Sequence, residues 1–182
     1  MLLSKKRIVA LFVFCVNAHV SFSQNADSLM HMLDLSNGRP ELALDIINQA
    51  LIDNPNSEEL LSVRAEAHEL LKYYDKAVQD YQRLTLLQPT DENLWYLLGR
   101  NQFLNGDFDD ALKSLNRSTR LNSRFLPAFN TKTEVFLALG RYDAAMRVSD
   151  STLNIGGTAR SYFLQGEVNS RLGAWQRAQW AY

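Results

Sequence analysis

Small, apolar and turn-forming residues recur along this chain with a period close to 34 positions. Alanines stand 34, 34, 34 and 33 residues apart, and each opens a stretch with helical patterning: Ala43, Ala77, Ala111, Ala145 and Ala178. Five residues before each alanine comes a site typical of a turn, namely Gly38, Lys72, Gly106, Gly140 and Gly173. The pattern predicts five helix–turn–helix units, each of which must stack on a neighbour to bury its apolar face.

Three further positions repeat in the same register. An apolar residue comes early in the first helix of units two to five: Leu61, Trp95, Phe129 and Tyr162. A small residue usually follows four positions later: Ala65, Gly99, Thr133 and Gly166. An aromatic residue follows the turn: Tyr74, Phe108, Tyr142 and Trp175. We expect the small residue and the alanine of each unit to face each other where its helices cross, because larger side chains would overpack the crossing.

Several departures from the repeat carry expectations of their own. Lys72 replaces the turn glycine, which predicts a strained or differently shaped turn. Thr133 is large for a helix crossing. After the turn expected at Gly173, the second helix of unit five has barely begun at Tyr182, so the chain reads as a fragment of a longer protein. Acidic residues follow three of the turns and are expected to cap the second helices: Asp75, Asp109 and Asp143.

The third unit carries the clearest family signature. Trp95, Leu98 and Gly99 form Trp-x-x-Leu-Gly, and Ala111 follows twelve residues after the glycine. This unit resembles a tetratricopeptide repeat (TPR), and the resemblance extends over residues 24–182. It implies an all-α, right-handed superhelical solenoid of antiparallel helix pairs. The expected units are about 24–57, 58–91, 92–125, 126–158 and an incomplete 159–182.

Residues 1–23 have the features of a signal peptide. Lys5, Lys6 and Arg7 precede an apolar run over residues 8–20, and small residues at Ser21 and Ser23 suit cleavage before residue 24. The alternative is a retained membrane anchor, although the run is short for a span, which needs about 20 apolar residues. We therefore expect an exported protein in the periplasm or cell envelope of a Gram-negative bacterium, with no integral membrane span after cleavage.

Charge and composition exclude several function classes. The chain has 19 basic and 20 acidic residues; removal of the leader leaves 16 against 20, a net charge of −4. That balance argues against a nucleic-acid surface. Cys15 is the only cysteine and lies in the leader, while His31 and His68 are 37 residues apart. The sequence therefore predicts no catalytic, metal or cofactor site, and an enzyme is the least favoured reading.

The resemblance implies that the first helices of the units line a concave face that receives a protein or peptide partner. The positions expected on that face are Glu59, Ser62, Glu66, Glu69, Asn93, Tyr96, Arg100, Phe103, Asn130, Glu134, Leu137, Arg160, Phe163, Glu167 and Arg171. Some TPR co-chaperones hold a carboxylate with a clamp of lysine, arginine and asparagine. The matching positions here hold other residues, so the clamp is absent: Ser62, Glu66, Leu97, Arg100 and Pro127.

Two interpretations of the charges on this face stay open. Glu66, Glu134 and Glu167 occupy equivalent positions, interrupted by Arg100. In the first interpretation they are acidic positions (acidic stations) that select a basic and apolar partner, flanked by the aromatic residues Tyr96, Phe103 and Phe163. In the second they are ordinary solvated charges on a helix face. The predicted function is a protein–protein interaction scaffold. The alternative is a docking or sensory part of a larger envelope signalling or assembly protein, with its effector beyond residue 182.

Overall fold

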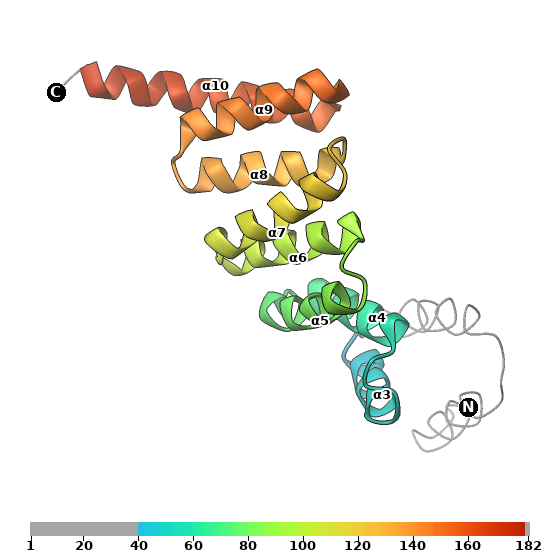
Figure 1. Cartoon of the computed structure of the whole chain (residues 1–182). Helices are drawn as coiled ribbons and strands as arrows, with labels where there is room; N and C mark the ends of the chain where they lie inside the picture. The colour runs from blue at the N-terminus through green and yellow to red at the C-terminus, as the bar shows by residue number, and fades with distance from the viewer. Residues whose placement is uncertain (1–39, 181–182) are drawn as a thin grey trace. The chain divides into compact units, whose positions relative to one another are not determined.

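The computed structural model describes residues 40–180, which form eight α-helices and no strand (Figure 1). The helices are α3 Pro40–Asp53, α4 Glu58–Leu70, α5 Tyr74–Leu87, α6 Glu92–Asn105, α7 Phe108–Leu121, α8 Leu126–Ala138, α9 Tyr142–Gly156 and α10 Ala159–Trp180. The predicted all-α class is confirmed. The leader, the start of the first repeat and residues 181–182 lie outside the described part of the chain.

The chain divides into two compact units at Tyr73. In its described part, the first unit holds α3 packed on α4. In the second unit, α5 packs on α6, α6 on α7, α7 on α8, α8 on α9 and α9 on α10. Helices α6 and α10 both also contact α8. Three of the helices predicted to line one face, α6, α8 and α10, therefore adjoin one another in the second unit.

The turns that follow α4, α6 and α8 share one geometry. Their central residues have positive φ, at 59° for Lys72, 91° for Gly106 and 67° for Gly140. In each turn the next N–H donates to a carbonyl five residues back, as Tyr73 does to His68 at 2.8 Å, Asp107 to Gln102 at 2.8 Å and Arg141 to Phe136 at 2.9 Å. Lys72 thus keeps the shape of the glycine turns while adopting a left-handed conformation that disfavours a side chain.

The crossing of α6 and α7 explains the small residues of the repeat. A Cβ at Gly99 would lie 2.7 Å from Leu115 Cγ and 3.1 Å from the carbonyl oxygen of Ala111, so only glycine fits. Ala111 and Leu115 are fully buried and join Ala128 and Val135 in one apolar cluster. The predicted small-residue contact is therefore confirmed in the third unit.

Thr133 shows how a larger residue is accommodated at the equivalent position of α8. Its side chain is buried, and its hydroxyl donates to the carbonyl of Phe129 at 3.1 Å. Because the backbone one turn earlier accepts this hydrogen bond, the buried hydroxyl is satisfied within its own helix.

The aspartates predicted to cap the second helices lie two positions past the residue that precedes each helix. Asp75, Asp109 and Asp143 lie in the first turns of α5, α7 and α9, where the helix dipole favours negative charge. The side chains that accept hydrogen bonds at a helix start belong to first helices instead, and one of them is Thr158 before α10, which accepts from the Ser161 N–H at 3.4 Å. Ser57 accepts from the Leu60 N–H, and Asp91 accepts from the N–H groups of Asn93 and Leu94.

The turn predicted at Gly173 is wrong, because α10 continues through it to Trp180 (Figure 1). A glycine inside a helix costs only about 1 kcal/mol relative to alanine, which the neighbouring helical turns can offset. The predicted crossing at Gly166 is also absent in the described residues, since a Cβ there would meet nothing within 4 Å. Trp175 consequently lies within α10 and does not open a second helix.

Candidate functional site

An open groove runs over α6, α8 and α10 in the second compact unit. It consists of two adjoining hollows of about 380 and 730 Å³. Both hollows are lined by Phe103 from α6, Glu134 from α8 and Arg160 from α10. Three first helices of the repeat thus contribute to one continuous lining, which the regular spacing of the repeat produces.

Aromatic packing fixes the walls of the smaller hollow. The ring of Tyr96 meets the edge of Phe125, with centroids 5.5 Å apart and an interplanar angle of 73°. The ring of Phe103 lies 6.0 Å from that of Phe108 across the α6–α7 turn. Both groove aromatics pack against the apolar cluster around Ala111. Because their inner edges are held by the core, they offer a preformed apolar wall.

An ion pair crosses the groove between α8 and α10. Arg160 donates to Glu134 Oε1 through Nε at 3.1 Å and through Nη2 at 2.5 Å. The same guanidinium lies 5.3 Å from the centroid of the Phe163 ring. The Glu134 side chain is 24% exposed and that of Arg160 is 56% exposed. Arg160 is therefore held from two sides, and its charge is partly open to solvent.

The larger hollow has both apolar and charged walls. Leu137, Leu139 and Leu164 supply apolar surface, and Glu167 and Arg171 lie at its α10 side. Arg171 Nη2 lies 3.7 Å from Glu167 Oε1, an i,i+4 pair on the helix surface. Two of the three expected acidic stations, Glu134 and Glu167, thus have an arginine beside them. This pairing was not anticipated from the sequence.

The remaining expected groove residues fall into separate places. Asn93 and Phe163 lie on α6 and α10 but line neither hollow. Asn130 lines the smaller hollow, yet it is buried and its Oδ1 accepts from Ser161 Oγ at 2.9 Å. Asn130 therefore links α8 to α10 and offers little exposed surface to a partner. Tyr96, Arg100, Leu137 and Arg171 do line the hollows, in addition to the three shared residues.

Four expected residues belong to α4, in the first compact unit. Ser62 lies on this helix, and Glu59 accepts a hydrogen bond from Ser57 Oγ at 3.2 Å. The pKa of Glu66 is raised by burial and, to a smaller extent, by the negative charge of Glu69. These residues form a separate acidic stretch of their own helix.

Residues at the ends of the helices and in the turns between them were missed by sequence reasoning. Leu104, Leu126, Pro127 and Thr158 line the smaller hollow, and Leu139 and Tyr142 line the larger one. A helical-face pattern identifies residues that share one side of a helix, and it does not identify residues that reach the groove from a helix end or a turn. Their signal was proximity to the turns, which bring the ends of successive helices to the rim of the groove.

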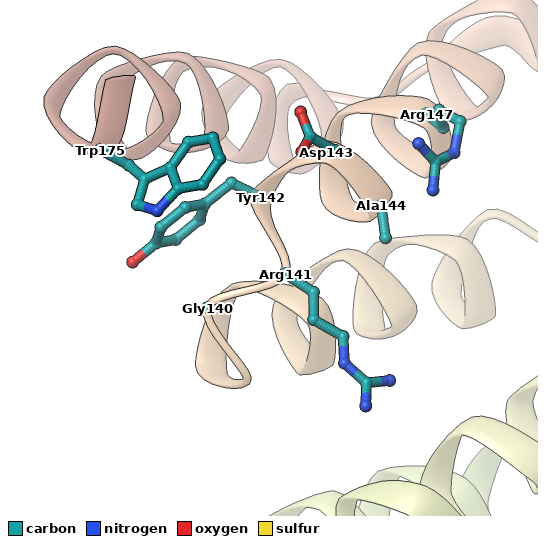
Figure 2. A pocket seen from close by; sticks show the side chains of 7 residues that line it. All are labelled: Gly140, Arg141, Tyr142, Asp143, Ala144, Arg147 and Trp175. Atoms are coloured by element: carbon teal, nitrogen blue, oxygen red, sulfur yellow. The ribbon is translucent and has the colours of Figure 1, made fainter. Parts of the chain in front are cut away.

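A third hollow of about 310 Å³ lies at the start of α9 (Figure 2). Arg141, Tyr142 and Arg147 line it together with Trp175 from α10. Figure 2 shows the rings of Tyr142 and Trp175 beside each other, where α10 passes the first turn of α9. The sequence had assigned both rings to the same repeat position in successive units, so it did not predict this meeting.

Within the residues that the structure describes, no group of three or more His, Cys, Asp or Glu side chains is arranged to hold a metal ion. In the same part of the chain, none of the helices has the length and apolar character of a membrane span.

Residues 22–125 match the family described as ChAPs, the Chs5p-Arf1p-binding proteins. The chain belongs to the ChAPs family. The match covers the first three predicted repeats and includes α6 and α7, with the Gly99 crossing and one wall of the groove. No curated protein matches the chain.

Solved structures confirm the TPR fold. A crystal structure of MamA protein matches with a TM-score of 0.70 and 21% identity, over 84% of this chain and 85% of that one. TTC0263, a thermophilic TPR protein of Thermus thermophilus, matches with a TM-score of 0.62 and 22% identity, over 82% of both chains. The TPR2B domain of yeast Sti1, in a complex with pHsp70, matches with a TM-score of 0.58 and 17% identity, over 63% of this chain and 97% of that one.

Proposed function

We propose that this protein is a non-enzymatic interaction scaffold that binds a peptide or a partner helix in the groove over α6, α8 and α10. The observation that carries the proposal is the shared lining of the two hollows by Phe103, Glu134 and Arg160. A groove built from three successive helices can contact a partner along several turns, and its apolar walls are already ordered by the core.

The charges of the groove suggest how a partner is selected. Leu137 and Phe103 offer apolar surface, while Glu134 and Glu167 each stand beside an arginine. A basic side chain that approaches Glu134 must compete with Arg160, and an acidic one can approach Arg160 from its open side. We therefore propose a partner with apolar side chains in the hollows and a charged side chain at the Glu134–Arg160 pair.

The comparisons support a protein partner. The family is named for proteins that bind Chs5p and Arf1p, and the Sti1 domain was solved in a complex with pHsp70. The carboxylate clamp expected of a heat-shock adaptor is not matched in this chain: Ser62, Glu66, Leu97, Arg100 and Pro127 occupy its positions. We therefore favour a partner other than a chaperone tail.

We also propose that the protein acts in the periplasm or cell envelope, on the strength of the basic and apolar leader over residues 1–23. In the alternative function, this chain docks partners for a larger envelope signalling or assembly protein. The full open reading frame discriminates between the two. An effector domain after residue 182 supports the alternative, and further repeats that end in a polar helix support the scaffold.

A charge-swap capture experiment tests the groove. The immobilised chain is exposed to envelope extract, and the retained proteins are compared among Glu134→Arg, Arg160→Glu and the double variant that restores the pair in reverse. Each single variant should lose the proteins that the native chain retains, because like charges then face each other across the groove. Asn116→Glu, on the exposed side of α7, is the matched control. Equal capture by all five proteins would refute binding in this groove.

A further inference from the structure

The hollow at the start of α9 has a lining unlike that of the groove. Four of its seven lining residues carry aromatic rings or guanidinium groups: Tyr142, Trp175, Arg141 and Arg147. Tryptophan, tyrosine and arginine are the residue types that most often carry the binding energy of protein interfaces. The volume of the hollow, about 310 Å³, is at the lower end of the range for ligand sites, so it suits a few side chains of a partner better than a large free ligand.

Two aromatic rings from different helices meet at this hollow. The Tyr142 ring from the first turn of α9 and the Trp175 ring from α10 lie beside each other (Figure 2). Tyr142 is partly buried, and Trp175 is 39% exposed. Because each ring supports the other while part of its surface stays open, the pair offers an ordered apolar surface to a side chain from another molecule.

The two arginines of the hollow are exposed and are not held in ion pairs. In the part of the chain that the structure describes, no acidic side chain lies within ion-pair distance of Arg141 or Arg147. The groove differs, because its arginines on α10 have glutamate partners. Asp143 is the one acidic residue of the hollow's lining, and Figure 2 shows it pointing away from Arg141. The lining therefore carries two guanidinium charges against one carboxylate.

Their spacing brings the two arginines to one side of α9. Arg141 precedes the helix, and Ala144 and Arg147 follow at intervals of three residues, a spacing that keeps side chains on one face. Figure 2 shows both guanidinium groups extending on the side of Ala144. Because the alanine between them is small, a carboxylate has room to approach either arginine, and the planar guanidinium can bind it through two N–H groups.

We propose that this hollow is a second binding site, which takes a short segment of a partner protein that carries an aromatic side chain next to acidic side chains. The partner's ring packs on Tyr142 and Trp175, and its carboxylates bind Arg141 and Arg147. Charge complementarity favours this occupant, since the lining has an excess of positive charge that would repel a basic segment. Gly140 and Tyr142 also line the larger hollow of the groove, so the two sites adjoin.

Titration of the chain with short peptides, followed by proton–nitrogen NMR, tests the site. The reporters are the indole N–H of Trp175 and the side-chain N–H groups of Arg141 and Arg147, each assigned from a variant that lacks it. The peptide acetyl-Phe-Glu-Glu-amide should shift all three signals saturably, with a dissociation constant of about 1 mM. Acetyl-Phe-Lys-Lys-amide and acetyl-Gly-Glu-Glu-amide should each bind about threefold more weakly or worse, because one lacks the acidic groups and the other lacks the ring.

A double variant, Arg141→Gln with Arg147→Gln, tests the contribution of charge. It should weaken the binding of acetyl-Phe-Glu-Glu-amide by about tenfold, and the difference from the native chain should shrink as sodium chloride is added. Arg117→Gln removes another exposed arginine, on α7, and should leave the affinity unchanged. An equal loss of affinity in Arg117→Gln would mean that the peptide responds only to the overall charge of the chain, against the proposal.

Three further results would overturn the proposal. The first is the absence of any shift of the Trp175 signal at about 10 mM acetyl-Phe-Glu-Glu-amide. The second is equal affinity for the lysine peptide or for free N-acetylphenylalanine, which would indicate an unselective contact or a small-molecule site. The third is a shift of the Arg160 side-chain signal alone, which would place the peptide in the groove and not in this hollow.

Discussion

Helices α6 and α10 have the same repeat register and opposite surroundings. α6 ends at Gly106, which turns the chain so that α7 covers Gly99. α10 passes through Gly173, and Gly166 stays open. The packing of the two helices differs as well. α7 covers α6 with the buried side chains Ala111 and Leu115. α10 meets α9 through the partly exposed ring of Trp175, which lies beside Tyr142 (Figure 2), and through polar groups such as Gln165, which donates to Asp150 at 2.8 Å. A glycine at the right register therefore permits a turn, and the packing of the next helix decides whether the turn forms.

The largest expected difference is in the stability lost when an apolar side chain is truncated at the α6–α7 crossing or on α10. Leu115 is fully buried against Gly99, so Leu115→Ala should reduce the free energy of unfolding by about 2–5 kcal/mol. Phe163 on α10 is 62% exposed, and Phe163→Ala should change it by about 0.5 kcal/mol or less. Urea unfolding at a fixed protein concentration measures both. Similar losses in the two variants would mean that α10 is covered as α6 is.

The two crossing glycines provide the next test. Gly99→Leu forces atoms into the space of Leu115 and the Ala111 carbonyl, with an expected loss of about 1–3 kcal/mol. Gly166→Leu enters open space and gains helix propensity, so stability should stay level or rise by up to about 1 kcal/mol. Thermal unfolding gives the comparison. An equal loss at Gly166 would show a covering helix in the same chain.

The two turn-register glycines should respond to alanine with opposite signs. Gly106 has a φ of 91°, which alanine adopts at a cost of about 1 kcal/mol, so Gly106→Ala should destabilise the chain. Gly173 is helical, and Gly173→Ala should stabilise the chain by about 1 kcal/mol. Chemical unfolding curves distinguish the signs. Destabilisation by Gly173→Ala would indicate that residue 173 turns the chain in solution.

The smallest contrast concerns charge on the two sides of α8. Toward α10, Glu134 meets Arg160 as an ion pair. Toward α7, the pKa of Lys132 is lowered by burial and then by the positive charge of Arg120. The folded state thus binds fewer protons at Lys132 than the unfolded state, between this lowered pKa and the usual value near 10.5. Stability should rise with pH across that window.

Lys132→Met removes this titration and tests its sign. The variant should gain up to about 1 kcal/mol at neutral pH, a gain reduced by the partial exposure of the side chain and by loss of its contact with the Phe129 ring. Because the native chain recovers stability as pH rises, the difference between the two proteins should shrink toward pH 10.5. A difference that grows with pH in denaturant titrations would reverse the assigned sign.

The repeat period predicted the helices, the Gly106 and Gly140 turns and the Gly99 crossing, because these follow from local spacing and side-chain size. It also placed Phe103, Glu134 and Arg160 on first helices, and the structure brings them into one groove lining. The continuation of α10 could not be predicted, since a helical Gly173 and a turning Gly173 differ by only about 1 kcal/mol of local preference.

The Glu134–Arg160 pair and the burial of Asn130 were also beyond sequence reasoning. Both depend on how α8 and α10 approach each other, which the spacing of residues along one helix does not determine. The residues at helix ends and turns that line the rim, Leu104 and Thr158 among them, depend on the same approach. The sequence therefore identified the helices that form the groove, but the pairing of the groove's side chains could be determined only from how those helices pack.

The central claim, that a partner lies in the groove over α6, α8 and α10, is tested most directly by site-specific photo-cross-linking. A photoreactive phenylalanine analogue replaces Leu137, in the larger hollow, or Asn116, on the exposed side of α7. After irradiation in envelope extract, mass spectrometry should identify the same cross-linked protein from position 137 in replicate experiments and none of it from position 116. Equal cross-linking from both positions, or cross-linking from position 116 alone, would contradict the account.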